Sequence, residues 1–392
     1  MAGNFSQAGI GWDVGMPSGW GTYGTNLAYE FARQQVEPAL FMVHEDIKLT
    51  PQQLTVLKPA LEQSKKWFEV GRRGGETLNF PLLVGLNDGM KFHDFLHGLR
   101  GKPFVGVPFF ESATIKPDIV ESTARTFDLI IAGSSWNAEI LAKHGIGNVR
   151  SCFQGVDLSL FKPGKKTGRF DDRFVIFSGG KLEYRKGQDL VVAAFKQFHQ
   201  KHPDSLLVPA WYNPWPQVAK NLGMSPHVAG PPPLKADGFL DVAGWMAANG
   251  LPKGSFFEPG MLTNIETPPL LWEADLAVFP NRCEGGTNLV AMECMACGVP
   301  VALSRNTGHL DLIRPDNCYS LDMQIPIGAV TGRANLEGWG ETFIDELVTA
   351  MEKAYTDRED ARRRGAAGAA FMQDWGWATQ VGRLIEALRE FS

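Results

Sequence analysis

The sequence predicts an α/β protein with two doubly wound parallel sheets. Short apolar runs alternate with helical patterns along the 392-residue chain, which implies parallel strands joined by right-handed crossovers. The alternation stops at a loop rich in Pro, Gly and charge near residue 165, and then restarts. Gly-rich loops follow strands in both halves. Because ligands of open parallel sheets bind outside the carboxyl ends of the strands, we expect the chemistry in a cleft between two halves.

Residues 1–165 hold the first alternation. Apolar runs of strand length lie, in order, at Ala8–Val14, Pro38–Val43, Leu82–Leu86, Phe104–Val107 and Leu129–Ala132. Helical patterns lie at Thr22–Arg33, Pro51–Phe68 with a break expected at Pro59, Ile119–Thr126 and Trp136–Lys143. This order predicts a first Rossmann-like domain, because each helix pattern connects two strand patterns.

Residues 166–372 repeat the pattern, and residues 373–392 form a terminal helical segment. Strands are expected at Phe174–Ser178, Ser205–Ala210, Leu276–Phe279 and Val299–Ser304. Helices are expected at Gln188–His199, Leu289–Cys297, Thr342–Tyr355 and Trp377–Phe391. The Pro- and aromatic-rich stretch 212–235 is interpreted as a structured excursion, since exposing Trp215 and its neighbours to water would be costly.

Charge and composition exclude several classes. The net charge of −5 does not favour bulk nucleic-acid binding, and the pairs Lys65–Lys66 and Arg72–Arg73 fit solvated faces better than ligand sites. No apolar run reaches the length of a membrane-spanning helix, and no signal-peptide pattern is visible at the start. Five cysteines, odd and sparse for this length, favour a reducing cytoplasm over a disulfide framework.

Two patterns that resemble metal sites are incomplete. Cys294 and Cys297 form C-x-x-C without a second Cys or His pair nearby, inside an apolar helical run, so they are interpreted as buried small residues. His93 and His97 could share a helix face but have no third ligand in view. We expect no metal site.

A first candidate ligand loop is GGKLEYRKG, residues 179–187, between a strand and a helix. Its glycines allow close backbone approach, and Lys181, Arg185 and Lys186 place three cations within six residues. A diphosphate needs backbone N–H groups, point charges and a helix N-terminus. The loop is not a Walker A motif. A polar turn with surface cations is the alternative; we expect contact with a diphosphate, with Gly180 and Arg185 also at the ligand.

A second candidate loop is EGGTNLVAME, residues 284–293, also between a strand and a helix. Glycines before a helix start leave N–H groups free for a phosphate, and Thr287 or Asn288 can serve as N-cap. Glu284 can accept from sugar hydroxyls, and Glu293, one turn into the helix, from a ribose diol. The predicted donor-binding residues of this loop are Gly285, Gly286, Thr287, Asn288, Leu289 and Glu293.

In this order and separation, the two loops resemble those of the retaining nucleotide-sugar glycosyltransferases of family 4, group 1, which have the two-domain GT-B fold. The resemblance is strongest in GGKLEYRKGQDL, in residues 279–313 and in GVDLSLF at 155–161, and it extends to DWGW at 374–377. It implies two Rossmann-like domains, the first on the acceptor side and the second binding the donor. It also implies that the last helix crosses back onto the first domain.

The resemblance also implies roles for single residues. The family's diphosphate-binding Arg and Lys fall on Lys181 and Lys186, and its paired glutamates fall on Glu284 and Glu293. Eight residues separate these glutamates instead of the family's seven, and the extra residue lies in 285–288. Gly308 and His309 are expected to complete the donor pocket.

The first half carries fewer signals. The family's Gly-rich loop after the first strand corresponds to Gly19, Trp20 and Gly21, which are assigned to donor binding. Many members carry a His after the fourth strand; here PFFES follows, and Glu111 is the nearest polar candidate. Its alternative role is in a salt bridge.

The resemblance implies transfer with retention of anomeric configuration, without cofactor or metal. The expected catalytic residues are Lys181, Lys186, Glu284 and Glu111, and the leaving diphosphate itself can deprotonate the acceptor. Two alternatives stay open: a non-catalytic nucleotide-sugar-binding protein and a GT-B nucleotide-sugar epimerase. The donor's base and sugar are not readable, and the acceptor can be a glycan, lipid, small molecule, protein or nucleic acid, with peripheral membrane contact also open.

Overall fold

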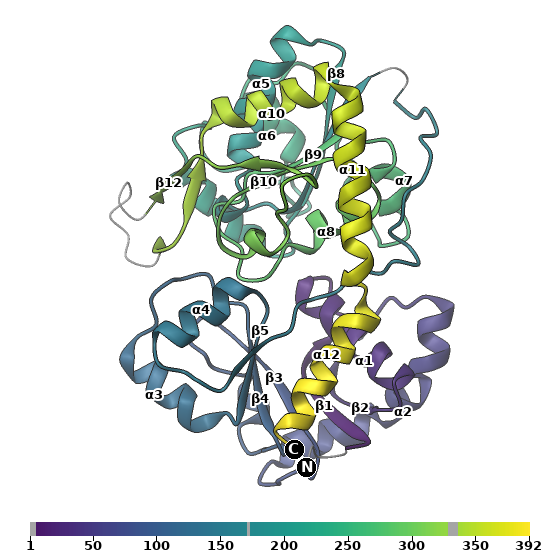
Figure 1. Ribbon diagram of the computed structural model, residues 1–392, viewed down its shortest axis with the longest axis vertical. Coiled ribbons are helices and arrows are strands. Elements are labelled where there is room, and N and C mark those ends of the chain that lie inside the picture. Colours follow the sequence, from purple (N-terminus) through teal and green to yellow (C-terminus); the bar gives the residue numbers. More distant parts are fainter. Residues whose placement is uncertain (1–4, 171–172, 328–335) are drawn as a thin grey trace. The chain divides into compact units, whose positions relative to one another are not determined.

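The computed structural model describes residues 5–170, 173–327 and 336–392 (Figure 1). The chain divides into two compact units. The first unit comprises Met1–Gly155, Gly285–Thr287 and Trp375–Ser392, and the second comprises Val156–Glu284 and Asn288–Asp374. The main break therefore lies at residues 155–156, earlier in the chain than the boundary expected at residue 165.

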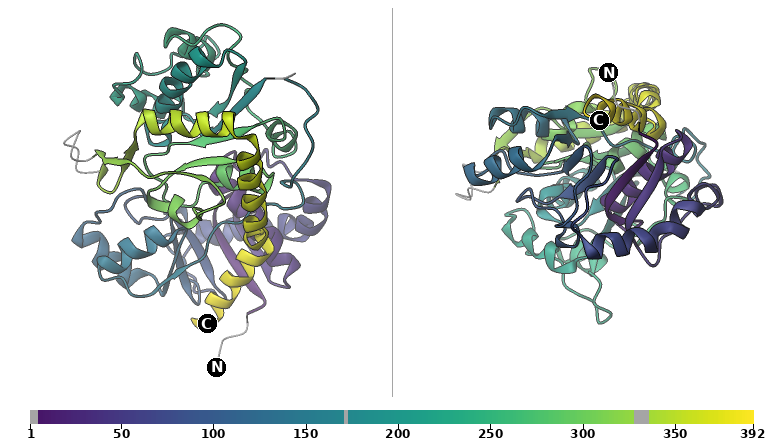
Figure 2. Two further views of the ribbon diagram at one scale, coloured as in Figure 1. Left: turned by 45° about the horizontal axis from the view of Figure 1, so that its top comes forward. Right: turned by 90° about the horizontal axis from the view of Figure 1, so that it is seen from below.

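The first unit contains a parallel sheet in the order β2-β1-β3-β4-β5-β6. Its strands are β1 Gln7–Val14, β2 Glu37–Val43, β3 Leu82–Leu86, β4 Phe104–Pro108, β5 Leu129–Ala132 and β6 Val149–Ser151. Its helices are α1 Gly19–Arg33, α2 Pro51–Arg73, η1 Asp94–Leu96, α3 Pro117–Thr126, α4 Ser135–Lys143 and α12 Trp377–Glu390. Helices lie on both faces of the sheet (Figure 2), so the doubly wound prediction is confirmed for this half.

The expected helix break at Pro59 is wrong, because α2 continues through it. A proline inside a helix removes one backbone hydrogen bond. Here the helix is fixed at its start by a capping box between Thr50 and Gln53 and is held to the core by buried side chains such as Trp67. The packing of this long face outweighs the local cost. The basic pairs Lys65–Lys66 and Arg72–Arg73 of α2 are exposed, as expected of solvated side chains.

The pair His93 and His97 does not share an α-helix face. His93 and His97 flank the short 3₁₀ turn η1 instead, where the ring of His93 accepts from the Phe95 N–H at 3.2 Å and His97 lies 3.6 Å from Asp94. Local side-chain bonds of this kind favour a turn over a helix. Within the described residues, no group of three or more His, Cys, Asp and Glu is placed to hold a metal ion.

The terminal helix α12 packs against α1 within the first unit (Figures 1 and 2). The rings of Tyr23 and Trp377 stack at 5.8 Å, and Gly155 leaves no room for a side chain because a Cβ there would lie 2.6 Å from the Trp377 backbone. This arrangement confirms that the last helix returns to the first half of the chain.

The second unit contains a parallel sheet in the order β11-β10-β9-β7-β8. Its strands are β7 Phe174–Lys181, β8 Ser205–Tyr212, β9 Leu276–Phe279, β10 Val301–Ser304 and β11 Tyr319–Leu321, and a separate antiparallel hairpin joins β12 Gln324–Pro326 to β13 Gly340–Thr342. Its helices are η2 Tyr184–Lys186, α5 Gln188–Lys201, η3 Pro216–Met224, α6 Val242–Ala248, α7 Thr267–Leu271, α8 Leu289–Ala296, η4 Thr307–Asp311, α10 Ile344–Thr356, α11 Arg358–Met372 and η6 Gln373–Trp375. This is the second doubly wound half, with a helix, α11, that the sequence patterns did not indicate.

The stretch 212–235 is structured, as expected, but one of its aromatic side chains, that of Trp215, is exposed to water. Trp215 is 37% exposed at the carboxyl end of β8. The stretch buries Ala219 and Leu222 in the core instead. The expectation that Trp215 is covered is therefore wrong.

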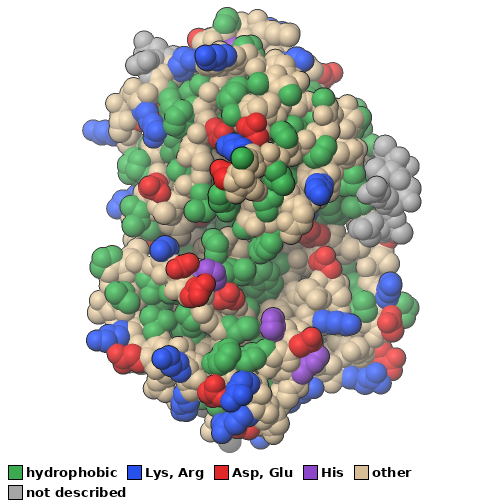
Figure 3. All heavy atoms as spheres, turned by 180° about the vertical axis from the view of Figure 1, so that it is seen from behind, with side chains coloured by type: hydrophobic (Ala, Val, Ile, Leu, Met, Phe, Trp, Pro, Cys, Tyr) green, Lys and Arg blue, Asp and Glu red, His purple; other side chains and the backbone are tan. Residues whose placement is uncertain are grey.

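Three further features complete the description. No helix of the described residues is long and apolar enough to cross a membrane. On the face in Figure 3, cations and carboxylates are interspersed among neutral side chains. All five cysteines are buried and free, including Cys294 on α8 and Cys297 at the C-cap of that helix.

Candidate functional site

The carboxyl ends of β7 and β9 meet in the second unit at a topological switch point. β7 lies between β9 and β8, so the crossover after β8 returns past β7 to the other side of the sheet. Crevices at such points are where open parallel sheets bind ligands. Both candidate loops of this unit follow these strands.

The loop after β7 begins inside the strand itself. Gly180, expected in the loop, is still paired in β7, with a φ of 122° that side-chain-bearing residues rarely adopt. Gly187 has a φ of 70° and begins α5, and a Cβ there would lie 2.2 Å from the Pro280 carbonyl oxygen. These glycines allow the short turn η2 to place Arg185 and Lys186 beside the loop that follows β9.

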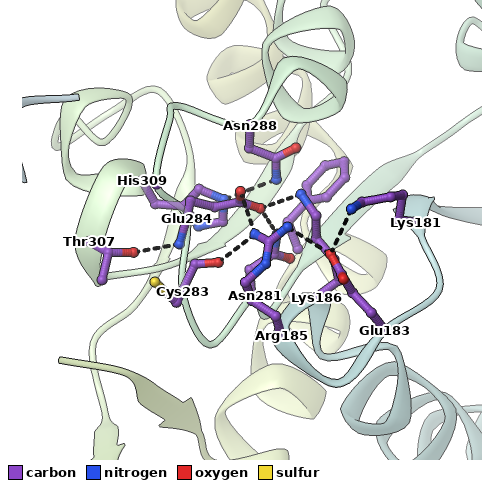
Figure 4. A network of polar contacts seen from close by, with 12 residues as sticks. Lys181, Glu183, Arg185, Lys186, Asn281, Cys283, Glu284, Asn288, Thr307 and His309 are labelled. Atoms are coloured by element: carbon purple, nitrogen blue, oxygen red, sulfur yellow. Dashed lines mark hydrogen bonds and ion pairs between the residues drawn. The ribbon is translucent and has the colours of Figure 1, made fainter. Parts of the chain in front are cut away.

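Glu284 is the centre of an ion-pair cluster that we call the Glu284 cluster (Figure 4). Its members are Lys181, Glu183, Arg185, Lys186, Asn281 and Glu284. Lys186 Nζ lies 2.6 Å from one carboxylate oxygen of Glu284, and Arg185 donates to the other at 2.9 Å. Asn281 also donates to this carboxylate. The cluster therefore joins the two candidate loops through charge-assisted hydrogen bonds.

The surroundings fix the charges in the Glu284 cluster. Burial by itself would raise the pKa of Glu284, but Lys186 and Arg185 outweigh it and lower this pKa to about 2. Burial likewise opposes ionisation of Glu183, yet Arg185 and Lys181 hold its pKa below the usual range. Burial lowers the pKa of Lys186, against the attraction of Glu284. Three cations facing two carboxylates leave one net positive charge.

Lys181 is the accessible cation of the cluster. Its side chain is 39% exposed, compared with 13% for Lys186 and 7% for Arg185. It lies 3.7 Å from Glu183, longer than the other ion pairs of the cluster. Of the three cations, Lys181 can therefore reach an external anion with the least rearrangement.

His309 is buried next to the cluster and is held neutral. Asn288, the N-cap of α8, accepts from the Ala291 N–H through its side-chain oxygen, so its amide nitrogen donates to His309 Nε2 at 3.0 Å. His309 Nδ1 then donates to the Ser304 carbonyl oxygen at 3.2 Å. Burial lowers the pKa of His309 to about 4. This ring can therefore serve as a positioned polar group but not as a cation at neutral pH.

The loop that contains His309 also holds the backbone of Glu284. The Glu284 N–H donates to the Thr307 hydroxyl at 2.8 Å, and Gly308 N–H donates to the Glu284 carbonyl at 3.0 Å. Gly308 and His309, predicted to complete the pocket, thus lie beside Glu284. Their role toward a ligand stays a prediction.

Glu293 has surroundings opposite to those of Glu284. It lies half-buried on α8, and no cation pairs with it among the described residues. Burial, with a further contribution from Asp157, raises the pKa of Glu293 to about 8. A carboxyl in this state is suited to hydrogen-bond hydroxyl groups.

Part of the second loop belongs to the first unit. This part is Gly285, Gly286 and Thr287, while Asn288 and Leu289 begin α8 in the second unit. Within the first unit, the Ser134 hydroxyl donates to the Gly285 carbonyl oxygen at 2.7 Å. Asn288 has a φ of 69°, which asparagine tolerates better than other side-chain-bearing residues.

The remaining candidates lie in the first unit. Gly19, Trp20 and Gly21 form the first turn of α1, so the helix starts earlier than the expected Thr22. Trp20 packs edge-on against Trp12 and Phe109 in an aromatic cluster. Glu111 lies beyond the end of β4 and is half-buried. The positions of Gly19, Trp20, Gly21 and Glu111 do not test their predicted roles in donor binding and catalysis, which stay predictions.

Sequence reasoning missed a second ionic network next to the cluster, which we call the Arg282 network. Arg282 is fully buried and donates to Asp189 at 2.6 and 2.7 Å, to Glu341 at 2.8 Å and to the Tyr184 carbonyl at 2.6 Å. Its own N–H donates to the Arg185 carbonyl at 2.7 Å. The one available signal was an arginine placed between an apolar strand and a Gly-rich loop.

Two family models match the second half of the chain. The model described as "Glycosyl transferases group 1" matches residues 173–323. The model described as "Family 4 Glycosyltransferase in conflict systems" matches residues 266–384. Together the matches include both loops of the Glu284 cluster.

Curated relatives are distant. The GDP-mannose-dependent alpha-(1-6)-phosphatidylinositol monomannoside mannosyltransferase of Mycolicibacterium smegmatis is 25% identical over 252 residues, 60% of this chain and 54% of that protein. The D-inositol 3-phosphate glycosyltransferase 1 of Catenulispora acidiphila is 24% identical over 287 residues, 67% of this chain and 57% of that protein. The chain thus spans little more than half the length of these relatives.

Solved structures match over nearly the whole chain. A sucrose-phosphate synthase from Thermosynechococcus elongatus has a TM-score of 0.66 at 17% identity, covering 99% of this chain and 100% of that one. Anabaena HepE in complex with UDP-glucose has a TM-score of 0.64 at 15% identity, and the match covers 98% of this chain and 99% of that one. These likenesses show the GT-B fold. With its two doubly wound sheets, the chain has the GT-B fold, and its second half is similar to the group 1 glycosyltransferases of family 4.

Proposed function

We propose that this protein transfers a sugar from a nucleoside diphosphate sugar to an acceptor hydroxyl, with retention and without metal or cofactor. The observation that carries the proposal is the Glu284 cluster, which gathers three cations at the switch point of the second sheet. Among the relatives, one is named for dependence on GDP-mannose, and one solved neighbour holds UDP-glucose.

The chemistry follows from where charge develops. Cleavage of the sugar–phosphate bond builds negative charge on the leaving diphosphate, and fixed cations stabilise that charge more in the transition state than in the ground state. Lys181 and Lys186 take this role. Because Lys186 is already bonded to Glu284 at 2.6 Å, donor binding shares or replaces that bond, and Glu284 then faces the sugar hydroxyls. Glu293 accepts the ribose diol, and the first unit binds the acceptor.

The direct test measures release of nucleoside diphosphate from GDP-mannose and UDP-glucose, with phosphatidylinositol monomannoside and D-inositol 3-phosphate as acceptors. These acceptors follow the names of two relatives. Transfer in excess chelator supports metal independence, and NMR of the product decides the anomeric configuration. Donor binding without release on any acceptor would favour a non-catalytic binding protein. Conversion of donor alone into an epimer would favour an epimerase.

A further inference from the structure

Trp215 differs from every other tryptophan of the chain. All 11 tryptophans lie in the described ranges, and the other ten are buried or half-buried while Trp215 is 37% exposed. A large aromatic ring at the surface next to a charged cluster is a common feature of recognition sites, since exposing it to water is unfavourable.

The backbone around Trp215 is held in place. Prolines 214 and 216 restrict it on both sides. The Trp215 N–H donates to the side-chain oxygen of Asn213 at 3.0 Å, and the Asn213 amide donates to the Leu182 carbonyl at 3.0 Å. Asn213 is itself buried. These bonds tie the Trp215 backbone to Leu182, the residue after Lys181, so little backbone freedom is lost when a ligand binds here.

The ring lies beside the accessible cation of the Glu284 cluster. Lys181 Nζ is 5.5 Å from the centre of the Trp215 ring, and the strand register pairs Lys181 with Tyr212, three residues before Trp215. A cation–π contact at an exposed site is weak. A phosphate can therefore draw the Lys181 ammonium away while the aromatic face stays in place.

We propose that Trp215 is the stacking platform for the base of the donor nucleotide, with Lys181 at the adjacent phosphate. This inference rests on the proposed function. Trp215 follows β8, on the side of β7 opposite to β9, and Glu284, which is assigned to the sugar, follows β9. A diphosphate at Lys181 and Lys186 thus has its sugar toward β9 and its nucleoside toward β8. The bicyclic indole offers its largest contact to a bicyclic purine.

The test compares binding of GDP, UDP and inorganic pyrophosphate by calorimetry. Stacking on an aromatic side chain contributes enough that Trp215→Leu is expected to weaken GDP binding about 10- to 100-fold, with a smaller loss for UDP. Pyrophosphate binding should stay within about twofold. Trp215→Phe should recover much of the GDP affinity, and GDP should quench the tryptophan fluorescence of the wild type more than that of this variant. Phe68→Leu, which removes an exposed ring on α2 of the first unit, is the matched control.

The outcomes separate this inference from the proposed function. Unchanged GDP affinity in Trp215→Leu, while the wild type binds GDP, overturns the stacking role and leaves the proposed function standing. An equal loss for GDP and pyrophosphate assigns Trp215 to the phosphate site or the fold, and also overturns it. A wild-type protein that binds no nucleoside diphosphate overturns both.

Discussion

The Glu284 cluster and the Arg282 network stand two residues apart on one loop, yet they differ in how completely their charges are satisfied. In the Arg282 network the arginine has no exposed surface, donates to two carboxylates and one carbonyl, and lies 3.8 Å from the centre of the Tyr184 ring. In the Glu284 cluster Lys181 is 39% exposed and loosely paired. A fully paired, buried network such as that of Arg282 holds loops in position. A cluster with an exposed, loosely paired cation keeps a positive charge available for a ligand.

The Arg282 network and the Glu284 cluster are also linked through backbone hydrogen bonds. The Arg282 N–H donates to the Arg185 carbonyl and the Arg282 guanidinium donates to the Tyr184 carbonyl. The Arg282 network therefore positions the turn η2, which carries Arg185 and Lys186 of the Glu284 cluster. Glu341 of the hairpin accepts from Arg282 and, through its other oxygen, from His227 at 3.1 Å. We therefore expect damage to the Arg282 network to appear as lost stability, and loss of a cation from the Glu284 cluster to appear as lost turnover.

The largest effect is expected for Arg282→Met. It leaves Asp189 and Glu341 without their cation in a buried site, which should lower the free energy of unfolding by about 3–5 kcal/mol, measured by urea denaturation. Arg305→Met, at an exposed arginine 3.9 Å from Asp322, is the matched control and should change stability little. A loss for Arg282→Met no larger than for the control would contradict a closed structural network.

Lys186→Ala should act on the chemical step. Removing a cation that faces the developing charge of the diphosphate is expected to lower kcat by roughly 10²–10³, measured as nucleoside diphosphate release. Lys196→Ala, at an exposed lysine on α5, is the control and should keep wild-type turnover. Near wild-type kcat in Lys186→Ala would sink the catalytic assignment.

Glu284→Gln should destabilise the free protein at neutral pH by about 2–3 kcal/mol, since the folded-state pKa of Glu284 is lowered from 4.5 to about 2. The stabilisation by the carboxylate is present above the unfolded-state value and is lost as pH falls through the folded-state value. The difference between variant and wild type should therefore shrink between about pH 4.5 and pH 2 in chemical denaturation. A difference that does not change with pH would show that the carboxylate is not held by its cations.

Glu293→Gln should change the stability of the free protein in the opposite direction to Glu284→Gln. The pKa of Glu293 is raised from 4.5 to about 8, so ionising it in the folded state is unfavourable, and the penalty grows from about pH 5 and levels off above about pH 8. The variant should be more stable than wild type at pH 8 by roughly 1–2 kcal/mol, less than the full pKa shift implies because the Glu293 side chain is partly exposed to water, and similar to it near pH 4. Glu293→Ala, which removes the hydrogen-bonding group, should bind nucleotide more weakly in calorimetry. Unchanged nucleotide affinity would refute the ribose role.

Much of the fold could be predicted from the sequence because strands and crossover helices leave local patterns. The nine expected strands correspond to β1–β5 and β7–β10, and both candidate loops lie at carboxyl ends of strands, as expected. The errors are also local. Pro59 lies inside a continuous helix and Gly19 already begins α1, because packing and capping by neighbouring residues outweigh the preference of a single residue.

The sequence by itself determined that the chain has two doubly wound halves and that Lys186 and Glu284 lie on loops that follow strands. Lys181, expected in the first of these loops, is the last residue of β7. Only the tertiary structure decided that Lys186 bonds Glu284, 98 residues away, that Arg282 joins Asp189 and Glu341, and that Trp215 stays exposed beside Lys181. The reason is physical: periodicity and turn residues report contacts within a few positions, whereas ion pairs and exposure depend on which strands become neighbours. The order β9-β7-β8 sets those neighbours, and no local pattern encodes it.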